Sequence, residues 1–127
     1  MTLKMYQITD FPTFFEKVKS QKLPFKTSYR LTILAQEIEK HINFYQEKFR
    51  ELVLAYSEKD EAGNPAPTDD GRGIKLAEAT MQEAYAELGE LRSLDVELPE
   101  HKFSIDDFAD VELSPIEMNI ILPFIAE

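Results

Sequence analysis

A long, uninterrupted heptad stripe is the feature that most limits how this chain can fold. From about Lys26 to Lys59 the sequence contains no glycine or proline, and apolar residues recur at alternating spacings of four and three. This alternation is typical of a coiled-coil seam, along which one face of a helix packs against another helix. At 1.5 Å per residue the helix would be roughly 50 Å long, so it needs a partner. The stripe consists of Leu31, Ala35, Ile38, Ile42, Tyr45, Phe49, Leu52 and Tyr56.

A second, shorter stripe supplies that partner. It follows residues 61–73, a segment dense in glycine and proline that includes the turn signal Asp70-Gly71. Two stripes joined in this way predict an antiparallel helical hairpin, with Phe49 in its core opposite small residues. We expect this connector, residues 61–73, to be exposed and to pair with itself as a two-stranded ribbon. The second stripe consists of Ala77, Met81, Ala84, Leu88 and Leu91.

Shorter elements flank the hairpin. Before it, Asp10 is expected to cap an amphipathic helix that ends before Pro24 and packs on the acidic hairpin of its own molecule through Phe14 and Val18. After it, the period changes to two, first in Leu94, Val96 and Leu98 and then in Phe103 and Ile105, which predicts two short strands.

A last helix is predicted near the end of the sequence. Ser114, Pro115 and Glu117 form a capping box with proline in the first helical position, which is a strong start signal. Ile116, Ile120, Ile121 and Phe124 make this helix apolar on one side, and Pro123 ends it.

These elements predict a mainly α fold with α+β character at its margins. A long antiparallel helical hairpin carries a short N-terminal helix and a small C-terminal appendage of strands and a short helix. We expect one domain over residues 1–127, because a chain of this length builds a single core. Within it the N-terminal helix occupies residues 1–24, the hairpin residues 25–92 and the appendage residues 93–127.

The charge of the chain is unevenly distributed and points to the kind of partner. The formal net charge is −10, yet residues 1–30 carry six basic and two acidic side chains. Because phosphates would meet a like-signed field over most of the protein, we expect no direct nucleic-acid binding. A protein partner with a basic surface is favoured, and a homo-oligomer is compatible with this interpretation.

The inventory of reactive side chains indicates a protein without catalysis. Cysteine is absent, which excludes disulfides and thiolate chemistry, and His41 lacks a second ligand at a metal-binding spacing. His101 is expected in an exposed turn. Phosphate-binding glycine loops, nucleophile elbows and kinase motifs are absent, so we expect no enzyme activity and no cofactor. Without a secretory signal or a membrane-length apolar stretch, the chain is expected in the cytoplasm and away from membranes.

Two charged sets are the candidate contact residues. The cluster at residues 106–112 has oxygen ligands of the kind that Mg²⁺ or Ca²⁺ takes, but it lacks EF-hand spacing, and a solvated turn is the preferred interpretation, so no metal is expected. The first set, expected to contact a partner, is Asp95, Glu97, Asp106, Asp107, Asp110 and Glu112. The alternative set, beside the apolar face of the first helix, is Lys17, Lys19 and Lys22.

Aromatic residues around the hairpin form a third candidate surface. They outnumber what a two-helix seam needs, so either some form an exposed anchor patch or residues 1–24 and 94–127 cover them. The residues are Tyr29, Phe44, Tyr45, Phe49, Tyr56 and Tyr85.

Three stretches resemble small uncharacterised proteins of tailed bacteriophages and prophages. They are EKDEAGNP at residues 58–65, LDVELP at 94–99 and LSPIEMNIILPFI at 113–125, and the resemblance covers residues 26–127. It implies a phage origin and a location in the cytoplasm of the bacterial host or in the virion. These motifs are structural, so the resemblance assigns no functional residues.

The sequence therefore predicts a non-catalytic phage protein that acts by protein contact through an acidic helical body. Its use would be in assembly, in the virion or in regulation. One alternative is an acidic inhibitor that imitates nucleic acid and blocks a host defence or replication protein, which requires acids at phosphate-like spacing on one face. Another is a carboxylate-metal enzyme, which requires the acids around Asp106 to converge.

Overall fold

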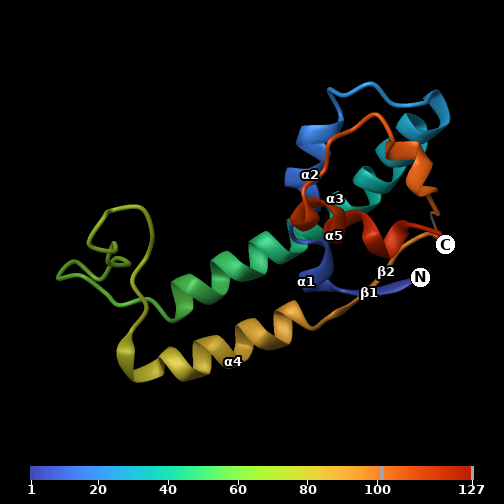
Figure 1. The fold of residues 1–127 in the computed structure, drawn as a ribbon. Helices are drawn as coiled ribbons and strands as arrows, with labels where there is room; N and C mark the ends of the chain where they lie inside the picture. Colours follow the sequence, from blue (N-terminus) through green and yellow to red (C-terminus); the bar gives the residue numbers. More distant parts are fainter. Residues whose placement is uncertain (101, 127) are drawn as a thin grey trace. The chain divides into compact units, whose positions relative to one another are not determined.

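The computed structural model describes residues 1–100 and 102–126, and the expectation for His101 falls outside these ranges. Helices dominate, with one small sheet, which confirms the predicted mainly α class (Figure 1). Short 3₁₀ helices, η1 to η3, cover Glu78–Thr80, Ile105–Phe108 and Leu122–Phe124. The main elements are β1 (Thr2–Lys4), α1 (Met5–Ile8), α2 (Phe11–Val18), α3 (Phe25–Ala55), α4 (Met81–Arg92), β2 (Asp95–Glu97) and α5 (Pro115–Ile121).

The chain divides into two compact units. We call residues 1–42 and 95–127 the core unit and residues 43–94 the hairpin unit. Helix α3 contributes its first part to the core unit and its last part to the hairpin unit. The division does not coincide with the predicted segments, since it falls inside α3, and the expectation of one domain stays a prediction.

Aromatic packing holds the core unit together. The Phe11 ring of α2 lies 6.2 Å from Phe124, and the Phe14 ring lies 6.2 Å from Phe108. Val18 is also fully buried, so the apolar side of α2 faces inward as predicted. The predicted aromatic packing on the hairpin is wrong, because the aromatic partners of α2 are Phe108 and Phe124 of the C-terminal segments. The expected cap by Asp10 is wrong: its backbone is already helical, with φ −94° and ψ −2°, and its side chain accepts no capping hydrogen bond.

The two-stranded sheet joins segments far apart in the sequence. Strand β2 was predicted, and it pairs in antiparallel register with β1, with Leu3 opposite Val96. The second predicted strand is wrong. Phe103 forms only an isolated bridge to Ile125, and the chain then enters η2 because Ser104 and Asp107 make a capping box that favours a helical turn.

The terminal helix begins at its predicted capping box. The Glu117 amide donates to the Ser114 Oγ at 3.2 Å, and the Ser114 amide donates to the Glu117 Oε1 at 2.9 Å. Ile121 and Phe124 are fully buried, as the apolar side requires. The expectation for Ile116 is wrong, because this residue of the first turn is 77% exposed.

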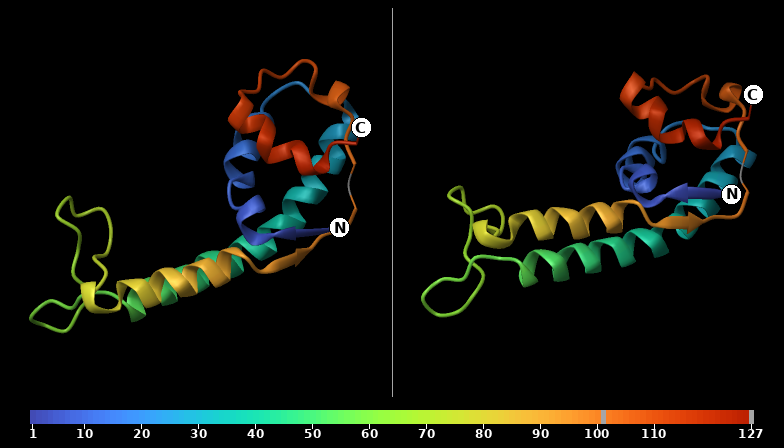
Figure 2. Two further views of the ribbon diagram at one scale, coloured as in Figure 1. Left: turned by 60° about the horizontal axis from the view of Figure 1, so that its bottom comes forward. Right: turned by 90° about the horizontal axis from the view of Figure 1, so that it is seen from below.

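In the hairpin unit, the last part of α3 lies beside the antiparallel α4 (Figure 2). Ala84 and Leu91 of the second stripe are buried. Phe49 is 39% exposed, so its predicted core position is wrong. Helix α3 also ends earlier than the stripe suggested, at Ala55, because the backbone of Tyr56 then accepts a hydrogen bond from Ala77 instead of continuing the helix.

The connector is exposed but more ordered than a two-stranded ribbon. Three short segments bridge one another pairwise, each to both of the others. Gly63 and Gly71 lie at the two turns with φ of +83° and +72°, a conformation that favours glycine and that confirms the turn predicted at Asp70-Gly71. The bridges join Ser57 to Leu76, Lys59 to Pro65 and Pro67 to Ile74.

Candidate protein-binding surface

The acidic residues expected to contact a partner do not form one free surface. Asp95, the first residue of β2, forms an ion pair with Lys4 of β1, whose Nζ lies 2.6 Å from the carboxylate Oδ1. Glu97 accepts a hydrogen bond from the Thr2 hydroxyl across the same strand pair. Both carboxylates are therefore used to join the strands.

The other four acidic residues follow one another through η2 and the loop after it. The Asp107 carboxylate accepts the Ser104 amide at 2.9 Å and so caps η2. Asp106, Asp110 and Glu112 are exposed. Within residues 1–100 and 102–126, no three His, Cys, Asp or Glu side chains gather closely enough to hold a metal ion.

Two of the three alternative contact residues form ion pairs within the core unit. The Lys17 Nζ lies 2.7 Å from the Glu117 Oε1, which links α2 to α5. This hydrogen bond, together with those from Ser114, lowers the pKa of Glu117 to about 2. Lys19 pairs with Glu16 at 2.9 Å, and Lys22 is exposed. A partner that binds these three lysines would compete with the ion pairs of Lys17 and Lys19.

The hairpin unit is poorly covered for a helical structure of its size. Within residues 43–94, all of which the structure describes, the buried side chains are those of Ser57, Ala84 and Leu91. Large apolar side chains remain in water on both helices, and the structure thus confirms part of the predicted surplus of exposed aromatics. The exposed side chains are Phe44, Phe49, Leu54, Tyr85 and Leu94.

One side of the two helices carries an open groove of about 460 Å³. Apolar and acidic side chains both line it. We call it the α3–α4 groove. It is lined by Phe44, Lys48, Glu51, Leu52 and Ala55 from α3, and by Glu87, Glu90, Leu91 and Leu94 from α4 and the residues after it.

Charge in the α3–α4 groove is negative on the α4 side. Lys48 is the groove's one cation, and its Nζ lies 3.2 Å from the Glu51 carboxylate and 5.8 Å above the Phe44 ring. This pairing offsets the charge of Glu51 and leaves Glu87 and Glu90. The hydrogen bond to the Glu87 carboxylate raises the pKa of the Tyr56 hydroxyl, and nearby Glu83 acts in the same direction. The groove thus combines apolar side chains with acidic charge from α4.

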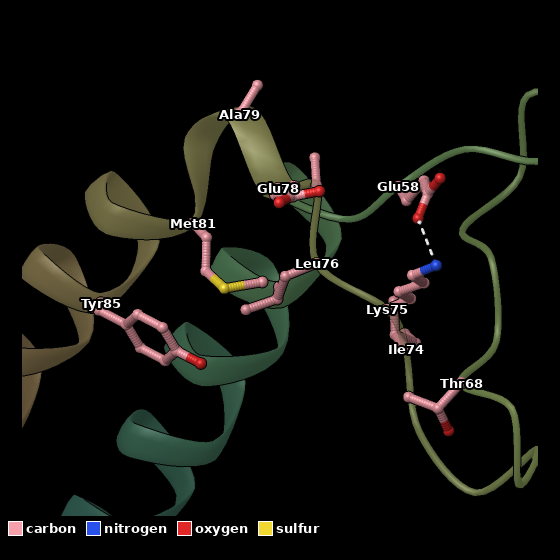
Figure 3. A pocket seen from close by; sticks show the side chains of 10 residues that line it. Glu58, Thr68, Ile74, Lys75, Leu76, Glu78, Ala79, Met81 and Tyr85 are labelled. Carbon is pink, nitrogen blue, oxygen red and sulfur yellow. Dashed lines mark ion pairs between the residues drawn. The ribbon is translucent and has the colours of Figure 1, made fainter.

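A larger hollow of about 680 Å³ lies where the connector meets α4 (Figure 3). Met81, Leu76 and Tyr85 form its apolar side, and Glu58 and Lys75 face each other on the connector side. The Lys75 Nζ lies 3.3 Å from Glu58, so the one cation among the lining residues of the hollow is already paired. Tyr85 and Glu87, two residues apart on α4, point to different sides of the helix, and the hollow is therefore separate from the α3–α4 groove.

Sequence reasoning found part of the α3–α4 groove. Phe44 belongs to the predicted aromatic surplus, and its position outside the 4-3 stripe was the available signal. Leu94 was missed because its alternation with Val96 assigned it to a strand. Its exposure depends on what lies next to it in space, which a local pattern does not report.

Comparisons with known proteins supply no relative: no family model, no curated protein and no solved structure matches the chain significantly. In the part of the chain that the structure describes, no helix has both the length and the apolar character needed to cross a membrane.

Proposed function

We propose that this chain is a non-catalytic protein-interaction module whose α3–α4 groove receives an amphipathic helix with basic flanks. The observation that carries the proposal is the incomplete burial of the hairpin unit around a groove lined by apolar and acidic side chains. Helix pairs in globular proteins ordinarily bury their shared apolar stripe under further helices. A partner helix would provide that cover.

The dimensions and charge of the groove suit this occupant. Its α3 lining runs from Phe44 to Ala55, about 16 Å of helix, which matches roughly three turns of a docked helix. Apolar anchors at helical spacing would enter between Phe44, Leu52 and Leu94, as in helix-in-groove recognition. Basic side chains beside those anchors would meet Glu87 and Glu90, which favours faster association and correct orientation.

Nucleic-acid mimicry is supported less well. Of the acids expected to imitate phosphates, Asp95 forms an ion pair, and Glu97 and Asp107 accept hydrogen bonds within the core unit. A mimic needs its carboxylates free and evenly spaced. A phage origin and a role in assembly or regulation stay predictions that rest on the sequence resemblance.

A pair of synthetic peptides tests the proposed function with the full chain. Both peptides form an amphipathic helix with leucines on one face, and they differ in carrying lysines or glutamates beside that face. We expect the basic peptide to bind at least about tenfold more tightly in fluorescence anisotropy at low salt, because a tenfold change needs only about 1.4 kcal/mol. Equal affinity for the two peptides, or binding of neither, would refute the proposal.

A matched pair of variants locates the binding site. Phe44→Ala removes an exposed side chain inside the groove, whereas Leu54→Ala removes an exposed side chain of α3 outside it. The first should weaken the basic peptide several-fold and the second should leave its affinity unchanged. The reverse order would place the binding surface elsewhere.

A further inference from the structure

Two aromatic side chains stand out in water at the beginning of α3. Phe25 is 94% exposed and Tyr29 is 70% exposed, and they lie one helical turn apart on the same side of α3. Together with Lys26 and Arg30 they line a shallow hollow. We call these four residues the α3 ridge. A phenylalanine with this exposure contributes almost nothing to folding, since it buries almost no apolar surface.

The sequence around the α3 ridge is basic, with Lys17 and Lys19 already paired with Glu117 and Glu16. Between Glu16 and Glu37 the sequence contains five cationic side chains and no acidic one. Arg30 is held against the chain by donating to the Lys102 carbonyl oxygen at 3.4 Å. The cations between those two glutamates are Lys17, Lys19, Lys22, Lys26 and Arg30.

The ridge has the chemistry that the α3–α4 groove is proposed to bind. It is helical, it presents aromatic anchors at positions i and i+4, and cations follow each anchor at the next residue. The two anchors are about 6 Å apart along the helix axis, well within the length of the groove. Its positive charge complements Glu87 and Glu90.

We infer that the α3 ridge of one copy docks in the α3–α4 groove of a second copy. The inference rests on the proposed function and names its partner as this chain itself. Each copy carries one ridge and one groove, so the contact joins two different surfaces; it closes into a two-fold dimer when both ridges dock reciprocally, and otherwise produces head-to-tail chains or a larger ring. The docked area is small, with two aromatic side chains of about 150–250 Å² each at its centre, so the self-association should be weak.

Sedimentation of the full chain tests this inference. The weight-average mass should rise above the 14.7 kDa of one copy as concentration increases from about 10 μM to about 1 mM, the range where small interfaces associate. Because the ridge and the groove carry opposite charge, raising the salt from about 0.05 M to about 0.5 M should weaken their contact. Mass independent of concentration would overturn the inference.

Variants of the two surfaces identify the contact. Replacing Phe25 and Tyr29 together by alanine should weaken self-association at least tenfold, and so should replacing Phe44 and Leu94. Ile116→Ala is the matched control, because it removes an exposed apolar side chain of the core unit outside the ridge. Glu90→Lys reverses a charge of the groove without removing an apolar side chain, so it should weaken self-association. Glu83→Lys, on the same helix but outside the groove lining, is its control. Self-association that survives the ridge variant would overturn the inference.

Mixing the defective variants gives the decisive result. The ridge variant keeps its groove and the groove variant keeps its ridge, so a ridge-to-groove contact predicts that an equimolar mixture forms a complex that stops at two copies. No complex in the mixture, with each variant folded by circular dichroism, would overturn the inference. The inference would also be overturned if the wild-type chain stays monomeric while a thymidine oligonucleotide binds to its ridge. If the basic peptide binds the groove in any of these cases, the proposed function stands and only the self-association fails.

Discussion

Three phenylalanine-to-alanine substitutions measure how differently the two units are packed. Phe14 in the core unit is fully buried, with its ring 5.8 Å from Phe11 and 6.2 Å from Phe108. Phe49 in the hairpin unit is partly exposed and stacks on Tyr45 at 6.0 Å. Phe25 is almost entirely in water. The chemical change is the same at each position, so the loss of unfolding free energy should follow burial.

The expected losses differ by more than the error of measurement. Phe14→Ala removes the transfer free energy of a buried ring and leaves a closed cavity, which together cost about 3–5 kcal/mol. Phe49→Ala loses only part of the transfer free energy and opens no closed cavity, so it should cost about 1–2 kcal/mol. Phe25→Ala should change stability by less than about 0.5 kcal/mol.

Urea unfolding followed by far-ultraviolet circular dichroism measures the three losses, provided that the slope of free energy against urea stays constant. A loss for Phe49→Ala as large as that for Phe14→Ala would refute the reasoning. It would mean that the hairpin unit is closed around Phe49.

Two further predictions concern acid stability and the glycines. The pKa of Glu117 is lowered to about 2 in the folded chain. Its stabilising contribution is therefore complete above its ordinary pKa near 4.5 and is lost as the pH falls towards 2. Lys17→Met removes the main cause of this shift, so the unfolding free energy of this variant should decrease less between pH 4.5 and pH 2 than that of the wild type. Gly63→Ala and Gly71→Ala should each destabilise by about 1 kcal/mol because φ is positive, whereas Gly89→Ala, inside α4 with open space around it, should stabilise by about 0.5–1 kcal/mol in thermal or urea unfolding.

The elements with local signals were predictable from the sequence. Helices α3 and α4 follow from their 4-3 stripes, and α5 follows from the capping box of Ser114 and Glu117. The glycine turn at Gly71 follows from the Asp-Gly pair. In each case the residues that carry the signal lie within a few positions of the structure they produce, because helical hydrogen bonds and turns join near neighbours.

Tertiary structure alone decided which apolar residues face water and which segments meet. Strand β1 is too short to show a period, and it forms because β2, more than ninety residues later, pairs with it. Phe103 and Ile105 belong to one apparent alternation, yet the first is fully buried and the second is exposed in η2. Phe49 lies in the stripe but is only partly covered, and the proposed binding surface is lined by other side chains of α3 and α4. Burial and strand pairing are contacts between segments distant in sequence, so a local pattern can specify an apolar face without specifying what covers it.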